Sequence, residues 1–264
     1  MQRNTFLKLT ALGGLALGMG GCGDPAKTHI LTLSFDDGFK KSFYRIAEIH
    51  ESYGLKACFN VIASGHLPGF RGAGDWIRPE LLGNFDDWNA LKSRGHELMP
   101  HSWEHLKLTE IPLAQAQANI DKCLDYFARY LEGYRDEDAV YNFAYNASTP
   151  ELDAFVLQRV AAVRTGGWLV LQDTWVNLIP TAPGPLQLGC WSRGPELCDA
   201  YVEEAVNAFL ASPGGWLILN LHGLDAEGWG PVSTPYLDGL LKRLVEVDFL
   251  DVLPAGEVKS AKKA

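Results

Sequence analysis

Acidic and imidazole side chains recur at the ends of apolar runs in this 264-residue sequence. Asp36 and Asp37 follow the run HILTLSF, His101 and His105 follow HELMP, and His222 follows GGWLILNL. Two imidazole nitrogens and one carboxylate oxygen form a common ligand set for a divalent metal that keeps open positions for water. The spacing of the two neighbouring histidines places both rings on one side of a single turn. These residues predict a metal site with room for a bound water.

Short apolar runs alternate with amphipathic stretches along the chain, and these elements must position the polar residues. Run length and periodicity distinguish the two kinds of segment. We expect strands over residues 29–35, 56–63, 96–102, 139–145, 164–171, 214–223 and 249–254. We expect helices over residues 40–54, 86–95, 112–133, 150–161, 196–211 and 234–246.

Strands that are buried on both faces and separated by helices are typical of a parallel sheet closed, or nearly closed, into a barrel. No linker rich in proline or serine interrupts the alternation. We therefore predict a single α/β domain, a distorted (β/α) barrel of about seven parallel strands. In such barrels the chemistry gathers at the C-terminal ends of the strands. Tyr145 and Asp173 also lie at such ends.

The charge balance limits the kinds of partner. The sequence has 23 Lys and Arg against 32 Asp and Glu, which gives a net charge of −9. We therefore expect no nucleic-acid partner held by neutralisation of its phosphates. The composition, 47% hydrophobic and 21% charged, is that of a globular protein and excludes collagen-like and largely disordered classes.

Residues 1–21 are expected to be a secretory signal peptide and not part of the fold. A short basic segment precedes an apolar stretch that is too short to span a bilayer. Cys22 then stands at a lipoprotein-type cleavage site, and an ordinary signal cut near Gly23 is the alternative. We expect residues 22–264 to be exported to the periplasm or cell surface, with membrane contact only through a lipid anchor at Cys22.

Four further cysteines bear on the redox state of an exported chain. The loop between Cys190 and Cys198 contains a Gly-Pro pair that can turn it, so a disulfide there is expected, with free thiols as the alternative. Cys58 and Cys123 lie in apolar or helical stretches and are expected to be buried thiols. No pair has the CxxC spacing of a thiolate zinc site.

Three segments together resemble the motifs of a known family. LSFDDG at 33–38 is similar to the first motif of the polysaccharide deacetylases of the NodB-homology type, carbohydrate esterase family 4. HSWEH at 101–105 is similar to the second motif, and LNLHG at 219–223 to the last. The resemblance covers essentially the whole exported chain and implies a NodB-like barrel. It also implies a metal-dependent hydrolase that removes acetyl groups from a carbohydrate, foremost from N-acetylated amino sugars of a polysaccharide or oligosaccharide.

Carried over residue by residue, the resemblance assigns roles at the strand ends. Asp37, His101 and His105 would hold the divalent ion, with zinc expected first and cobalt, nickel or iron as alternatives. Asp36 would be the general base, and His222 the general acid that protonates the leaving group. A metal beside Asp36 keeps the carboxylate ionised and acidifies its bound water, so that a weak base suffices.

One motif departs from the family pattern. The segment NFAYN has Ala144 and Asn146 where the resemblance would place Arg and Pro. Arg164, ahead of the next predicted strand, can reach the same catalytic carboxylate from another place. We expect a backbone N–H near Tyr145 to complete an oxyanion site.

The segment QDTW at 172–175 loosely resembles the motif whose Asp orients the acid histidine. Asp173 is therefore expected as the catalytic partner of His222, and a solvated helix cap is its alternative reading. Tyr145, Arg164 and Trp175 are expected on the substrate-binding side of the site.

Two other classes of function remain open. HSWEH also fits the H-x-x-E-H signature of a metalloprotease, with Glu104 as base, but that motif needs a long helix and prolines flank it closely at Pro100 and Pro112. A non-catalytic carbohydrate-binding protein on the same fold is the second alternative, because the third-motif Arg is missing. Release of acetate from an acetylated glycan would distinguish the enzyme from such a binding protein.

Overall fold

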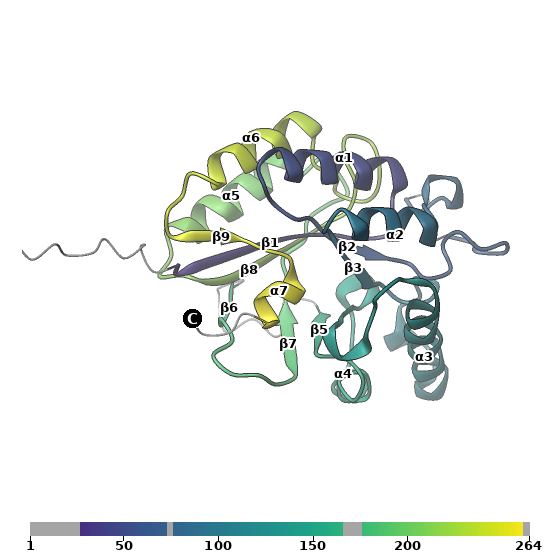
Figure 1. Cartoon of the computed structure of the whole chain (residues 1–264). Helices are drawn as coiled ribbons and strands as arrows, with labels where there is room; N and C mark the ends of the chain where they lie inside the picture. Colours follow the sequence, from purple (N-terminus) through teal and green to yellow (C-terminus); the bar gives the residue numbers. More distant parts are fainter. Residues whose placement is uncertain (1–26, 73–75, 166–175, 261–264) are drawn as a thin grey trace, which may run out of the picture.

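The computed structural model describes residues 27–72, 76–165 and 176–260 (Figure 1). The predicted signal segment, the lipid anchor and two predicted site residues lie outside the described residues: 1–21, Cys22, Asp173 and Trp175. Within the described part of the chain, no helix is both long and apolar enough to cross a membrane.

Six strands form the larger sheet: β1 (His29–Phe35), β2 (Cys58–Val61), β3 (Glu97–Pro100), β6 (Val176–Asn177), β8 (Gly215–Leu221) and β9 (Leu250–Val252). β1 lies at its centre, and all of its residues are buried. β8 pairs with β1 in parallel along its full length. The other edge of β1 is shared by β9 beside its first half and β2 beside its end. Only the short β6 is antiparallel to its neighbour in this sheet.

A smaller parallel sheet completes the barrel: β4 (Val140–Asn142), β5 (Ala162–Thr165) and β7 (Leu186–Gly189). On one side the barrel closes through Trp191, whose N–H donates to Ile218 at 2.9 Å and whose carbonyl accepts from Asn220 at 2.7 Å. On the other side the described residues of β3 and β4 form no ladder, and the Asn142 side chain donates to the Pro100 carbonyl at 3.3 Å. This is the distorted parallel barrel that the sequence predicts.

Helices surround the strands in two groups (Figure 1). One group lies along one side of β1 and β8: α1 (Lys40–Ser52), α2 (Phe85–Ser93), α5 (Asp199–Leu210) and α6 (Thr234–Leu244). The other group lies on the opposite side: α3 (Leu113–Tyr130), α4 (Pro150–Val156) and α7 (Ala255–Ser260). Short 3₁₀ turns connect them at Pro79–Leu81, Leu108–Glu110, Asp136–Asp138 and Ala144–Asn146.

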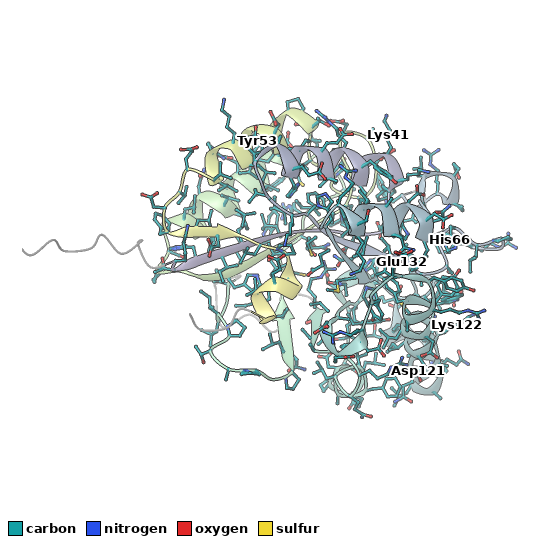
Figure 2. All side chains as sticks on the ribbon, in the orientation of Figure 1. Lys41, Tyr53, His66, Asp121, Lys122 and Glu132 are labelled. Carbon is teal, nitrogen blue, oxygen red and sulfur yellow. The ribbon has the colours of Figure 1, made fainter. Side chains whose placement is uncertain are left out.

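Large apolar side chains between helices and strands hold β1 and β2 in place. Phe43 of α1 stacks on Phe59 of β2 with ring centroids 4.4 Å apart, and Trp88 of α2 lies 5.6 Å from Phe43. Burying one such side chain stabilises a fold by about 1.5–3 kcal/mol. Charged side chains such as Lys41 point outward instead (Figure 2). The core therefore fixes the strand ends that carry the polar residues.

The predicted disulfide between Cys190 and Cys198 is wrong. Both thiols are free and buried. The Cys190 thiol donates to the carbonyl of Thr165 at 3.1 Å, and the Cys198 thiol donates to that of Gly230 at 3.1 Å. Each thiol thus has its own carbonyl partner. The other two described cysteines are free and buried, as predicted.

Alkylation of the unfolded, unreduced protein is expected to label Cys190 and Cys198 independently, because each thiol has a separate partner in the fold. Peptide mapping by mass spectrometry measures the label at each position. Cys123, which is buried in α3, serves as the reference for a free thiol. A peptide pair joined through positions 190 and 198 would contradict the expectation.

Candidate active site

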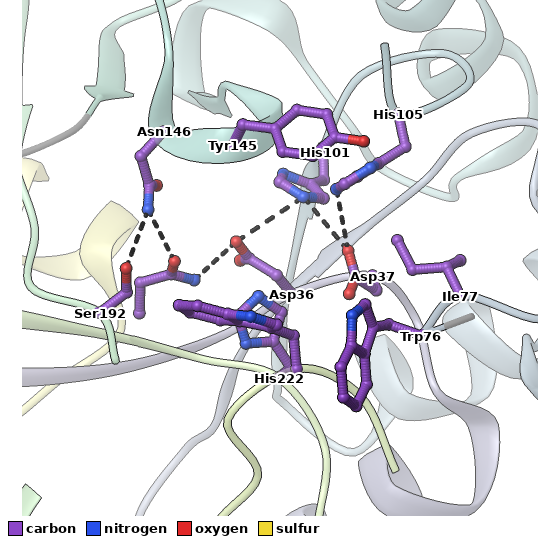
Figure 3. A pocket seen from close by; sticks show the side chains of 12 residues that line it. Asp36, Asp37, Trp76, Ile77, His101, His105, Tyr145, Asn146, Ser192 and His222 are labelled. Atoms are coloured by element: carbon purple, nitrogen blue, oxygen red, sulfur yellow. Dashed lines mark hydrogen bonds and ion pairs between the residues drawn. The ribbon is translucent and has the colours of Figure 1, made fainter. Parts of the chain in front are cut away.

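A cavity of about 410 Å³ opens where the C-terminal ends of the barrel strands meet (Figure 3). β1 leads directly into Asp36 and Asp37, β3 into His101, and β8 into His222. Because parallel strands end at the same rim of a barrel, side chains far apart in the sequence face one another there. The predicted clustering of these four residues, together with His105, is found on the cavity wall.

Asp37, His101 and His105 form the one group among the described residues whose atoms are placed to hold a metal ion. Oδ1 of Asp37 lies 3.4 Å from Nε2 of His101 and 3.3 Å from Nε2 of His105. Ligands bound at zinc distances and near-tetrahedral angles lie roughly 3.0–3.5 Å apart. Oδ1 of Asp37 is buried and has no hydrogen-bond partner among the described residues. The three side chains therefore fit a divalent ion.

Hydrogen bonds and backbone conformation orient the three candidate metal ligands. Nδ1 of His101 donates to the carbonyl of Asn142 at 2.9 Å, which leaves Nε2 facing Asp37. The backbones of Asp37 and His105 are left-handed, with φ of 77° and 57°. This conformation is costly for residues other than glycine and concentrates at functional sites. Ser102 Oγ accepts from the N–H of His105 at 2.9 Å and holds the turn.

Burial sets the protonation state of one of the ligands. The His105 side chain is surrounded by protein, and burial lowers its pKa to about 4, although the Asp37 charge opposes the shift. The ring is therefore neutral near pH 7, which is the state in which an imidazole nitrogen can bind a metal.

The metalloprotease alternative is excluded by the backbone. Residues 101–107 contain no helix, whereas the H-x-x-E-H motif needs a continuous helix through both histidines. Glu104 is exposed and accepts from the Asn119 side chain at 3.2 Å. Its carboxylate is thus not on the cavity wall.

Asp36 is held by the guanidinium of Arg164. Nη2 of Arg164 donates to Oδ2 at 2.5 Å and Nη1 donates to Oδ1 at 3.0 Å. Burial alone would raise the pKa of Asp36, but the charge of Arg164 and the nearby imidazoles hold it well below its usual range. Arg164 is 1% exposed and is not among the residues that line the cavity. Arg164 therefore contacts the carboxylate that the altered third motif pointed to, and its predicted place on the substrate-binding side is wrong.

His222 lies on the cavity wall near both carboxylates (Figure 3). Burial lowers the pKa of His222, and the charges of Asp37 and Asp36 oppose that shift. Its Nδ1 has no hydrogen-bond partner among the described residues. The predicted partner, Asp173, lies outside them, so this pairing stays a prediction.

Aromatic side chains form much of the remaining wall. Tyr145 is 53% exposed, has a left-handed φ of 58°, and places its ring 4.7 Å from that of His105. The Trp229 ring lies edge-on to His222 at 5.7 Å, and Trp76 also lines the cavity. Tyr145 therefore lies on the predicted substrate side, and the oxyanion role of its N–H stays a prediction.

Reasoning from the sequence did not identify the following side chains of the site: Asn60, Trp76, Ile77, Asn146, Ser192 and Asn220. Asn60 and Asn220 donate to Asp36 at 2.7 and 2.6 Å. Both lie inside buried strands, where a lone amide needs a hydrogen-bond partner. That rule was the signal that could have found them. Trp76 and Ser192 lie in irregular segments outside any motif and give no comparable signal.

Residues 23–147 match a family model described as polysaccharide deacetylase. This segment contains the three candidate metal ligands and Asp36, and it ends before Arg164 and His222. No protein of curated function matches the chain in sequence.

Several solved structures share the fold over most of their length. A proposed polysaccharide deacetylase from Mycobacterium smegmatis has a TM-score of 0.62 and 11% identity, with 89% of this chain and 90% of that chain covered. The peptidoglycan deacetylase PdaC from Bacillus subtilis has a TM-score of 0.54 and 17% identity, with 88% and 91% covered. A family 4 carbohydrate esterase from Streptomyces lividans has a TM-score of 0.54 and 14% identity, with 87% and 93% covered.

At these identities the likeness to solved structures shows the fold alone. The family model adds the motifs at the ends of β1 and β3, where the candidate metal ligands meet. Residues 23–147 thus match the polysaccharide deacetylase family in sequence, and the chain as a whole shares the fold of such enzymes.

Proposed function

We propose that this protein is an exported, metal-dependent enzyme that removes acetyl groups from a carbohydrate, foremost from N-acetylated amino sugars of a polysaccharide. One observation carries the proposal: the Asp37–His101–His105 cluster shares a single cavity with Asp36 and His222. Metal ligands, a proton acceptor and a proton donor are thus available around one reacting group. Zinc is the proposed ion, because it favours sets of nitrogen and oxygen ligands with an open position.

The chain's own residues divide the proton transfers between them. A divalent ion in the cluster would acidify a bound water and polarise the acetyl carbonyl. Asp36 stays ionised beside Arg164 and accepts the proton of the attacking water. His222 gives a proton to the departing nitrogen, which then leaves as a neutral amine.

The cavity walls favour an uncharged sugar. Trp76, Tyr145 and Trp229 line the cavity, and no lysine or arginine of the described residues does. Aromatic rings offer large apolar faces, against which the C–H face of a pyranose can pack. A non-catalytic carbohydrate-binding protein would use the same walls, and the absence of acetate release from acetylated glycans would favour that alternative.

His101→Ala is expected to lower zinc content strongly while the protein stays folded, because it removes one of three ligands. Elemental analysis after zinc loading measures occupancy, and circular dichroism measures folding. His66→Ala is the matched control, since His66 contacts Tyr126 and does not line the cavity. Full stoichiometric zinc in His101→Ala would overturn the assignment of the metal site.

Asp36→Asn is expected to keep its zinc but to lose turnover by about a hundredfold or more, the scale of general-base catalysis. An amide cannot accept the proton of the water. Acetate release and zinc content are measured on the same sample. Asp86→Asn is the control, because the sequence FDD recurs at 85–87 at the start of α2. If Asp36→Asn loses zinc and regains turnover when zinc is resupplied, the roles of Asp36 and Asp37 are reversed.

His222→Ala is expected to depress turnover of an N-acetyl sugar by a factor on the order of a hundred or more. The amine leaving group needs the proton that His222 supplies. An activated aryl acetate, whose phenolate leaves unaided, should be affected far less. Values of kcat/KM for the two substrates in wild type and variant give the test. Equal losses on both substrates would show that His222 has another role.

A further inference from the structure

The carboxylate of Asp36 accepts more hydrogen bonds than Arg164 alone provides. Oδ1 accepts from Asn60 at 2.7 Å and from Arg164 at 3.0 Å. Oδ2 accepts from Arg164 at 2.5 Å and from Asn220 at 2.6 Å. An ionised carboxylate offers about four acceptor positions, and the described donors hold both of its oxygens. Among these three partners, Asn220 alone also lines the cavity.

Asn220 is itself held by Asn146, which follows β4. Nδ2 of Asn146 donates to Oδ1 of Asn220 at 2.9 Å (Figure 3). Oδ1 of Asn146 faces the sulfur of Cys190 at 3.3 Å, and Nδ2 of Asn146 also faces Ser192 Oγ at 3.4 Å. The amide of Asn146 therefore lies where three segments meet. One segment follows β4, one follows β7, and the third is β8.

The carboxylate fixes the direction of this series of hydrogen bonds. Because ionised Asp36 can only accept, Asn220 must turn its NH₂ group toward it. The oxygen of Asn220 then faces Asn146, which must donate in turn. The orientation of each amide thus depends on its neighbour, and the series ends at Asp36.

We propose that Asn146 is a positioning residue that acts on Asp36 through Asn220. Asn146 holds the Asn220 amide in the orientation that Asp36 requires, and the amide in turn fixes the position of Oδ2 of Asp36. The inference rests on the proposed function, since it concerns the carboxylate that accepts the proton of the water. Neither asparagine belongs to the candidate metal cluster.

Asn146→Asp separates this proposal from a simple loss of packing. The variant has the same shape, and aspartate tolerates the left-handed φ of 49° at this position. A carboxylate cannot donate to Asn220, so the Asn220 amide meets an acceptor-only carboxylate on each side and can no longer hold its hydrogen bond to Asp36 in the same geometry. We expect kcat to fall roughly tenfold to a hundredfold, the scale of a misplaced catalytic group, with KM changed far less and zinc content unchanged.

Asn146→Gly removes the side chain and fits a positive φ without strain. Water from the cavity can then donate to Asn220 and keep its orientation, so the loss in kcat should be clearly smaller than in Asn146→Asp. Asn89→Asp is the control for the same chemical change, because the Asn89 amide also donates and accepts hydrogen bonds but lies in α2 and does not line the cavity. A loss of kcat in Asn146→Gly that equals or exceeds the loss in Asn146→Asp would overturn the proposal.

A measurement that needs no turnover completes the test. The side-chain NH₂ resonances of Asn220, assigned by their absence in Asn220→Ala, should show one strongly downfield proton because of the short bond to Asp36. Asn146→Asp should abolish that shift and Asn89→Asp should leave it. An unchanged shift in Asn146→Asp would overturn the proposal. A wild-type protein that has this shift and releases no acetate would instead contradict the proposed function alone.

Discussion

The buried ion pair between Arg164 and Asp36 is the interaction on which the rest of the site depends. Removing each charge from water costs several kcal/mol, which the attraction offsets only where the geometry is good and other donors complete the arrangement. The two terminal guanidinium nitrogens face the carboxylate, and Asn60 and Asn220 supply the other donors. The pair also joins the two sheets, since Asp36 follows β1 and Arg164 lies in β5.

This pair gives two adjacent carboxylates different chemistry. Asp36 is surrounded by donors, which holds its pKa well below the usual range despite burial. Oδ1 of Asp37 has no such donor among the described residues and faces two imidazole nitrogens instead. The first carboxylate is thus a fixed anion, and the second is left free to bind a metal. The two adjacent aspartates differ in chemistry because their side chains contact residues from different strands.

Much of this arrangement can be predicted from the sequence, because the strands are long apolar runs and their ends are marked by acidic residues and histidines. The missing third-motif Arg raised the contact of Arg164 with Asp36 as one expectation, beside a place for Arg164 on the substrate side. The roles of Asn60 and Asn220 could not be predicted, since an amide inside an apolar run has a role only through the side chain that it contacts, which here is Asp36. The short strands β6 and β7 lack periodicity, and the thiols of Cys190 and Cys198 find carbonyls that no local pattern indicates.

The missing ladder between the described residues of β3 and β4 separates the strands that precede it from those that follow it, and the two groups carry different residues of the site. The strands before it carry every candidate metal ligand, whereas those after it carry Tyr145, Asn146 and Arg164. Across the gap, the contacts are side-chain hydrogen bonds such as that from Asn142 to Pro100. Sequence change at Tyr145, which lies on the cavity wall after the gap, can therefore reshape that wall while leaving the candidate metal ligands in place. The later segments are not free to change throughout, because they also supply the Asn142 carbonyl that holds His101, the guanidinium of Arg164 and the ring of His222.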